Sequence, residues 1–213
     1  MLVDLDDTIV DRAGAFAEWA ATFVEQWRLG ADALPWMIEH DRSGFRLRDE
    51  FFAGVRERFG VPLSVGELIT EFYTVFPPLF TCADEVRDSL VRVRAEGWPI
   101  AIVTNGSPTQ ELKILAAGLD TLVDTWCISS VEGVRKPDPR LLEIAAERCS
   151  TTLAGAWLIG DAPDADIGAA VAAGVPSIWL RHGRLWPRDD YSPTFEADSF
   201  PEAVAMLPAP PQR

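Results

Sequence analysis

The stretch MLVDLDDTIV (residues 1–10) decides the fold, because it joins a short apolar run to three closely spaced carboxylates. The run from Met1 to Leu5 has the composition of a buried strand, and Asp4, Asp6 and Asp7 crowd its end. Two like charges about 4 Å apart repel by roughly 4 kcal/mol at an effective dielectric constant near 20. A chain that gathers negative charge in this way needs positive charge nearby, and the rest of the sequence indicates where it comes from.

Four more short apolar runs follow, and helical patterns lie between them. They are WPIAIVT (98–104), LVDTWCIS (122–129), AWLIG (156–160) and PSIWL (176–180). Most are continuous rather than alternating, which is typical of parallel strands buried on both faces. Strands that alternate with helices predict an α/β fold with a doubly wound parallel sheet.

Several helix boundaries carry sequence signals. Ser107 to Gln110 (SPTQ) predicts an N-cap, a proline at the first helical position and a capping-box partner. Asp138-Pro139 repeats the cap-plus-proline signal before RLLEIAAERC. Gly174 predicts the C-cap of the helix in ADIGAAVAAG.

Residues 12–80 interrupt the alternation and contain no convincing strand. One helical face collects apolar side chains, namely Phe16, Trp19, Ala20, Phe23, Val24 and Trp27. Further helices are expected over 34–40 and 48–59, and after a capping box formed by Ser64 and Glu67. We therefore predict two domains: an α/β core of residues 1–11 and 81–213, and an all-helical insertion of residues 12–80.

Composition excludes several classes of protein. The 213 residues carry a formal net charge of -14, which disfavours a nucleic-acid or anionic-membrane partner, because both need a basic face. The three cysteines are widely spaced and in apolar surroundings, which predicts reduced, buried thiols rather than a disulfide scaffold or a zinc site. The first apolar run is far too short for a signal peptide or a membrane span, so we expect a cytoplasmic protein.

Polar side chains follow the ends of the predicted strands. Ligands of open α/β sheets bind outside the carboxyl ends of the strands, so these residues are expected to converge on one rim. The set comprises Asp4, Asp6, Thr104, Asn105, Gly106, Lys136, Asp161, Asp164 and Asp166. Acids from two strands suit a hard divalent cation, and Mg²⁺ prefers oxygen ligands and often shares its shell with a substrate phosphate. The sequence therefore predicts a Mg²⁺ site, with Lys136 as a second positive charge.

Four motifs, in order, resemble those of the haloacid dehalogenase-like hydrolase superfamily. They are DLDDT (4–8), VTNGS (103–107), the lysine of GVRKPDP (133–139) and GDAPDAD (160–166). Residues 12–80 stand where this superfamily carries its helical cap. The resemblance spans nearly the whole chain.

The resemblance implies the following catalytic and metal-binding roles. Asp4 is the nucleophile and forms an aspartyl-phosphate. Asp6 is the general acid that protonates the leaving oxygen and then the base that activates water. Asp4, the backbone carbonyl of Asp6, and Asp161 hold Mg²⁺, Asp166 supports that site, and Asp164 assists.

The resemblance also implies a set of contacts to the substrate. Thr104, Asn105 and the backbone of Gly106 hold the phosphoryl group. Lys136 stabilises Asp4 and the charge on the phosphoryl oxygens. Arg46, in the polar segment EHDRSGFRLRDE (39–50), is the candidate for a second anionic group of the substrate, against the alternative of a solvated loop with local ion pairs.

These roles predict a Mg²⁺-dependent phosphatase of a small phosphorylated metabolite. An alkoxide leaving group profits from a proton donor and a halide does not, so the acid at Asp6 favours phosphate over halide chemistry. Two alternatives stay open. One is a phosphomutase, which returns the phosphoryl group to a second hydroxyl of a sugar phosphate. The other is a ligand-binding module with the same site but negligible turnover.

Overall fold

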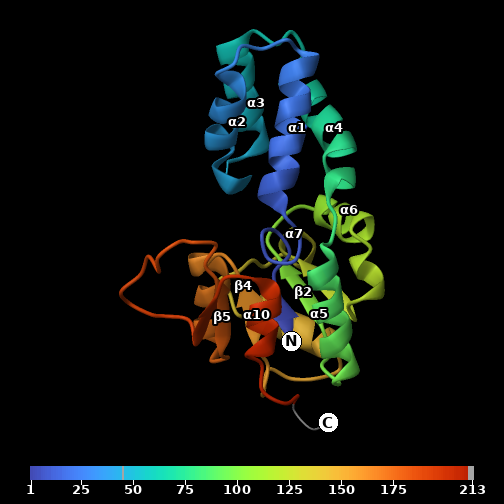
Figure 1. The fold of residues 1–213 in the computed structure, drawn as a ribbon, viewed down its shortest axis with the longest axis vertical. Helices are drawn as coiled ribbons and strands as arrows, with labels where there is room; N and C mark the ends of the chain where they lie inside the picture. The colour runs from blue at the N-terminus through green and yellow to red at the C-terminus, as the bar shows by residue number, and fades with distance from the viewer. Residues whose placement is uncertain (45, 211–213) are drawn as a thin grey trace. The chain divides into compact units, whose positions relative to one another are not determined.

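The computed structural model describes residues 1–44 and 46–210, which form two compact units (Figure 1). The α/β unit consists of Met1–Val10 and Thr81–Arg213, and the helical unit of Asp11–Phe80. Within the described part of the chain, no helix is both long enough and apolar enough to cross a bilayer.

The α/β unit is built on six parallel strands in the order β3-β2-β1-β4-β5-β6, which confirms the predicted doubly wound sheet. The strands are β1 (Leu2–Val3), β2 (Ala101–Thr104), β3 (Thr125–Ile128), β4 (Leu158–Gly160), β5 (Ser177–Leu180) and β6 (Phe195–Ala197). The first five lie inside the predicted apolar runs and are shorter than those runs. The edge strand β6 is an addition to the prediction, since its sequence FEA is exposed at its first two positions and shows no apolar run.

Helices cover both faces of this sheet. They are α5 (Asp84–Ala95), α6 (Thr109–Ala116), α7 (Ser129–Glu132), α8 (Arg140–Arg148), α9 (Gly168–Ala173) and α10 (Phe200–Ala205), with short helical turns at Leu119–Thr121 and Pro163–Ile167. On one face, residues of α8 and α9 pack with Leu2, Val103 and Leu158 in a single apolar cluster. Helices α5 and α10 contact each other and lie in front of the sheet in Figure 1. Every residue of β1, β2, β4 and β5 is buried, and since successive strand residues point to opposite faces, both faces of these strands are covered.

The helix-boundary predictions had different outcomes. Gly174 ends α9 with a left-handed φ of 66°, as predicted. The side chain of Asp138 accepts the N–H of Arg140 at 2.9 Å, and Pro139 lies one residue before α8 rather than inside it. The prediction of a capping box for α6 was wrong. The cap position is Pro108, which forms no side-chain hydrogen bond, and the side chain of Gln110 donates to Asp6 instead.

In the helical unit, the described residues form four α-helices around an aromatic core. They are α1 (Arg12–Gln26), α2 (Ala33–Asp41), α3 (Arg48–Phe59) and α4 (Val65–Val75), with helical turns at Arg42–Gly44 and Pro77–Leu79. The predicted capping box at Ser64 and Glu67 is present. Trp19 of α1 contacts Phe51 and Phe72 with ring centroids 6.1 and 4.8 Å away, and all three are buried. The packing of these large rings gives the unit its own core.

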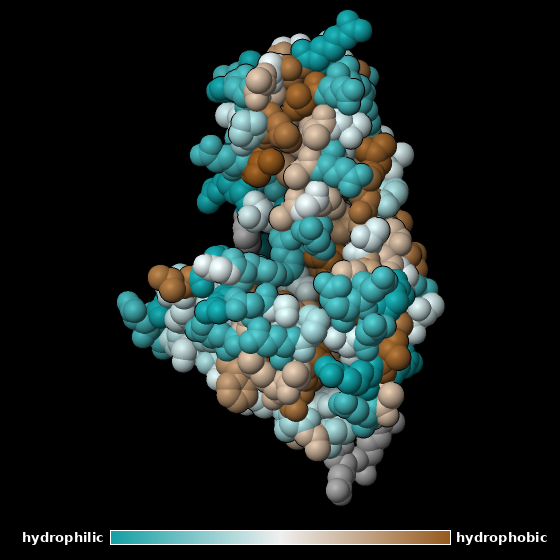
Figure 2. Space-filling model, in the orientation of Figure 1, coloured by the Kyte–Doolittle hydropathy of each residue, from teal (hydrophilic) through white to brown (hydrophobic). Residues whose placement is uncertain are grey.

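Apolar side chains reach the surface of both units. Figure 2 shows hydrophilic side chains over much of the face turned to the viewer, with apolar patches on each unit. Ile38, Leu47 and Val75 are among the exposed large apolar side chains of the helical unit.

Candidate active site

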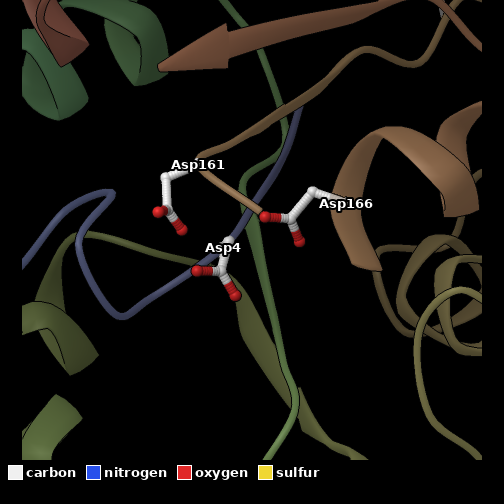
Figure 3. A group of neighbouring side chains, drawn as sticks. All are labelled: Asp4, Asp161 and Asp166. Carbon is white, nitrogen blue, oxygen red and sulfur yellow. The ribbon is translucent and has the colours of Figure 1, made fainter. Parts of the chain in front are cut away.

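Three aspartates lie together at the carboxyl edge of the sheet, and Figure 3 shows their side chains converging. Asp4 follows β1, Asp161 follows the neighbouring strand β4, and Asp166 comes from the helical turn Pro163–Ile167. One carboxylate oxygen from each residue lies within 4.8 Å of the others. We call these three residues the aspartate cluster. Strands β1 and β4 flank the point where the strand order reverses, which is where doubly wound sheets bind ligands.

Lys136 is the buried cation of this site, with a side chain only 1% exposed. Its ammonium donates to Asp4 Oδ1, Asp166 Oδ1 and the Val103 carbonyl, each at 2.6 Å. A lysine ammonium has three protons, so these acceptors use all of them. Burial alone would lower the pKa of Lys136, but the carboxylates of Asp166 and Asp4 raise it above its usual value. Lys136 is therefore a fixed positive charge shared by two carboxylates.

One buried ammonium does not balance three carboxylates, and two net negative charges remain among these four side chains when all are ionised. Burial, together with the charges of Asp166 and Asp4, raises the pKa of Asp161 to about 8. Burial also raises the pKa of Asp4; Lys136 opposes that shift and Asp166 reinforces it. The carboxylates outnumber the buried cation, and the all-oxygen donor set suits a hard divalent cation. The residues present thus fit a cation such as Mg²⁺.

Gly160 makes room for the aspartate cluster at the end of β4. A Cβ atom on this residue would lie 2.3 Å from Asp166 Oδ2 and 2.4 Å from its Cγ, closer than real side-chain contacts allow. Asp166 Oδ2 also accepts the backbone N–H of Ala162 at 2.9 Å, which fixes the carboxylate beneath the strand end. The glycine before Asp161 is therefore needed for the close approach of Asp166.

Two of the predicted phosphate-binding residues have other partners. The side-chain amide of Asn105 exchanges two hydrogen bonds with the backbone of Lys136, both 2.9 Å long. The N–H of Gly106 donates to Ser129 Oγ at 3.0 Å. Here the side chain of Asn105 and the N–H of Gly106 hold the Lys136 segment and the loop after β2, and their expected role toward a phosphoryl group stays a prediction. Thr104, only 1% exposed, remains at the end of β2.

Asp6 has partners that the sequence did not reveal. Lys113 Nζ lies 2.7 and 2.8 Å from its two carboxylate oxygens. Gln110 Nε2 donates to Asp6 Oδ2 and to Thr104 Oγ1, both at 2.8 Å. The side chain of Asp6 does not join the aspartate cluster, and the expected contribution of its backbone carbonyl to a metal stays a prediction.

The segment after β5 supplies further contacts at the rim of the site. Arg184 Nη2 donates to the carbonyl of Asp161 at 2.8 Å and to its Oδ2 at 3.1 Å. Trp179 Nε1 donates to the same carbonyl at 2.8 Å. His182 Nε2 lies 2.7 Å from the carbonyl of Asp7. Arg184 and His182 are exposed, so they border the site without being buried in it.

The remaining candidates lie outside this group. Asp164 is exposed and forms an ion pair with Arg188, so its side chain is not part of the aspartate cluster. Arg46 belongs to the helical unit, where its Nε donates to the carbonyl of His40 at 2.6 Å. Its role toward a substrate stays a prediction.

The sequence and the fold are both similar to those of known proteins. The sequence profile of haloacid dehalogenase-like hydrolases matches residues 1–174. The chain is 33% identical over 109 residues to a glyceraldehyde 3-phosphate phosphatase of Pyrococcus furiosus, covering 49% of this chain and 45% of the relative. It is 32% identical over 146 residues to a phosphoserine phosphatase of Thermus thermophilus, covering 65% of this chain and 55% of the relative. The chain spans about half the length of these curated relatives.

A solved structure extends the likeness to the whole fold. The HAD-hydrolase YfnB of Bacillus subtilis, in a form bound to magnesium, superposes with a TM-score of 0.81. The alignment covers 97% of this chain and 96% of the other at 22% identity. At this level of identity the likeness concerns the fold.

Proposed function

Because the chain belongs to the haloacid dehalogenase-like hydrolase family, we propose that it is a Mg²⁺-dependent phosphatase acting on a small phosphorylated metabolite. The observation that carries this proposal is the aspartate cluster, whose surplus negative charge surrounds the fixed cation Lys136. The printed names of the relatives, a glyceraldehyde 3-phosphate phosphatase and a phosphoserine phosphatase, support the same reaction class.

Four groups of this chain would hold Mg²⁺. Asp4 and Asp161 offer carboxylate oxygens, Asp6 offers its backbone carbonyl, and Asp166 lies close enough to contribute directly or to orient the others. When bound, the ion would supply positive charge to the oxygens of the transferring phosphoryl group.

The first half-reaction forms an aspartyl-phosphate. A carboxylate oxygen of Asp4 attacks phosphorus, the bond from phosphorus to the substrate oxygen breaks, and Asp6 gives its proton to that leaving oxygen. Lys136 keeps Asp4 oriented through its 2.6 Å bond and offsets charge on the phosphoryl oxygens. Thr104, at the end of β2, offers its hydroxyl to the same group.

The second half-reaction restores the enzyme. Asp6, now a carboxylate, takes a proton from a water molecule that attacks the phosphorus of the aspartyl-phosphate. The bond between phosphorus and Asp4 breaks, inorganic phosphate leaves, and Asp4 is a carboxylate again. The proton on Asp6 is ready for the next substrate.

The helical unit, Asp11–Phe80, would act as a cap that selects the substrate and excludes water while it is closed. Arg46 would bind a second anionic group of the substrate. This part of the proposal rests on the family, whose members carry a helical insertion at this point of the chain, and on the basic residues around Arg46.

Hydrolysis of p-nitrophenyl phosphate tests the mechanism. The wild-type protein should release nitrophenolate with Mg²⁺ and lose that activity in EDTA, and Asp4→Asn should be inactive in both conditions. Asp88→Asn, at an exposed position of α5, is the matched carboxylate-to-amide control and should behave as wild type. Equal rates for wild type, wild type in EDTA and Asp4→Asn would refute the proposal.

The same preparation separates the alternatives. A phosphomutase would isomerise a sugar phosphate without net release of inorganic phosphate. A binding module would bind a phosphorylated metabolite tightly and turn over none of a broad panel. Either result would replace the proposed function.

A further inference from the structure

Helix α6 buries two polar side chains together with Ile114 and leaves two leucines exposed. Gln110 and Lys113 are buried, at 4% and 6% exposure, whereas Leu112 and Leu115 are 47% and 49% exposed. Residues 110 and 113 lie one turn apart and share a face. An amphipathic surface helix normally turns leucines inward and lysines outward. Packing alone does not explain this arrangement, so the buried polar pair needs a partner that makes its burial favourable.

That partner is Asp6. Lys113 Nζ reaches both carboxylate oxygens, at 2.7 and 2.8 Å, and Gln110 Nε2 adds a third bond at 2.8 Å. The side chain of Asp6 is 22% exposed and that of Lys113 is 8% exposed. Charge-assisted hydrogen bonds of this length hold a carboxylate in one orientation. Both oxygens of Asp6 are therefore fixed by one helix.

Gln110 also links Asp6 to Thr104. The same Nε2 group donates to Thr104 Oγ1 at 2.8 Å. A hydroxyl oxygen that accepts a hydrogen bond keeps its own proton for donation. The arrangement thus holds the hydroxyl of Thr104 as a donor beside the carboxylate of Asp6.

The backbone makes room for this link. A Cβ atom on Gly106 would lie 2.6 Å from Gln110 Cγ and 2.8 Å from its Cδ. No positive φ accounts for the glycine, so close approach of the Gln110 side chain is its structural reason.

We propose that Lys113 and Gln110 are positioning residues for Asp6 and that Gln110 also orients Thr104. The inference rests on the proposed function, in which Asp6 gives a proton to the leaving oxygen. Neither residue touches the substrate. They act by fixing the carboxylate of Asp6 and the hydroxyl of Thr104 at the end of β2.

Leaving-group dependence tests the role of Lys113. The value of kcat/KM reports steps up to release of the leaving group, so it includes protonation by Asp6 but not the later attack of water. Glycerol 2-phosphate releases an alkoxide that needs this proton, whereas p-nitrophenyl phosphate releases a stable phenolate. Lys113→Met should lower kcat/KM about 100-fold for glycerol 2-phosphate and less than about threefold for p-nitrophenyl phosphate, since general acid catalysis contributes about 10²–10⁴-fold.

A double-mutant cycle shows whether Lys113 acts through Asp6. In an Asp6→Asn background, adding Lys113→Met should change kcat/KM for glycerol 2-phosphate by less than about twofold. Lys113→Arg should recover part of the lost activity. Gln110→Leu should lower kcat/KM for both esters, because it also releases Thr104, with the larger loss on glycerol 2-phosphate. Leu115→Gln, on the exposed side of α6, is the control and should match wild type.

The outcomes separate the two levels of inference. A wild-type enzyme with no Mg²⁺-dependent activity, or an active Asp4→Asn, overturns the proposed function and this inference with it. An active wild type whose Lys113→Met variant loses both esters equally, gains activity, or multiplies the defect of Asp6→Asn overturns the inference alone. If Lys113→Met does not fold, the same comparison is made with Lys113→Arg and Gln110→Leu. The inference then requires a larger loss of kcat/KM for glycerol 2-phosphate than for p-nitrophenyl phosphate.

Discussion

Each unit of the molecule buries an ion cluster, and the two clusters have opposite signs. In the helical unit the carboxylate of Asp41, 2% exposed, lies between Arg12 at 2.8 Å and Arg48 at 2.5 Å. In the α/β unit the ammonium of Lys136 lies between two members of the aspartate cluster, and a third carboxylate stands close by. One cluster has an anion at its centre and a surplus of cations, and the other has the reverse.

The position of each cluster in the fold indicates its role. Arg12 begins α1, Asp41 ends α2 and Arg48 begins α3, so the Asp41 cluster connects the ends of three helices. The N–H of Gly44 also donates to Asp41 at 2.8 Å. The aspartate cluster instead gathers its charge at strand ends, where ligands of such sheets bind. Replacing Asp41 should therefore lower the stability of the protein, whereas replacing Asp4 should abolish its activity.

Asp4→Asn is expected to have the largest effect of any single substitution. The amide is a poor nucleophile, so turnover of p-nitrophenyl phosphate with Mg²⁺ should fall by at least about 10³-fold. In the metal-free protein the melting temperature should not fall, because burial disfavours the charge on Asp4 and Lys136 keeps Asp166 and the Val103 carbonyl as acceptors. Calorimetry of the two metal-free proteins checks this. A large loss of stability would show that Asp4 is mainly structural.

Asp41→Asn should show the opposite behaviour. It leaves the buried guanidinium of Arg12 and the largely buried one of Arg48 without their anion, which costs about 3–5 kcal/mol of unfolding free energy. Urea denaturation measures this loss. Asp32→Asn is the control, because its ion pair with Arg58 is solvent-exposed and should contribute less than about 1 kcal/mol. Equal stability of the two variants would contradict a structural role for the Asp41 cluster.

The contrast also explains what could be predicted from the sequence. Strands β1 to β5 and the convergence of Asp4, Asp161 and Asp166 follow from apolar runs and the residues that end them, because all parallel strands deliver their carboxyl ends to one edge. Strand β6 pairs with the sheet on one side only and carries an exposed Phe195, so it leaves no apolar run.

The partners of Asp6 could not be found in the same way. Gln110 and Lys113 are polar residues one turn apart, a spacing that usually marks the exposed side of a helix. Their partner lies more than a hundred residues earlier in the chain. The exposed Leu112 and Leu115 indicate that α6 buries polar side chains, but this can be recognised only when the burial of the whole helix is known.

The charge surplus of the aspartate cluster predicts how stability depends on pH. The pKa of Asp161 is about 8 in the folded protein, against an ordinary value of 3.8, so between these values the folded state binds more protons than the unfolded state. The unfolding free energy of the metal-free protein should then fall as pH rises through this window, by at most about 1.4 kcal/mol per pH unit for this group.

Mg²⁺ should reverse this trend, because it replaces the proton. The rise in melting temperature on adding Mg²⁺ should be larger at pH 8.5 than at pH 5.5. Asp161→Asn should have a flatter pH dependence without metal and a smaller response to Mg²⁺. Identical pH slopes for wild type and Asp161→Asn would contradict the prediction.

Arg184 should have the smallest effect, because it is an exposed cation beside the surplus charge. Its Nη2 occupies an oxygen of Asp161 that Mg²⁺ could use, while Trp179 holds the Asp161 carbonyl independently. Arg184→Ala should therefore tighten Mg²⁺ binding by about two- to fivefold, the range of a solvent-exposed ion pair. Calorimetric titration with Mg²⁺ measures it. Arg181→Ala, whose guanidinium pairs with Asp198 instead, is the control. A more than tenfold weaker affinity would mean that Arg184 orients Asp161 for the metal rather than competing with it.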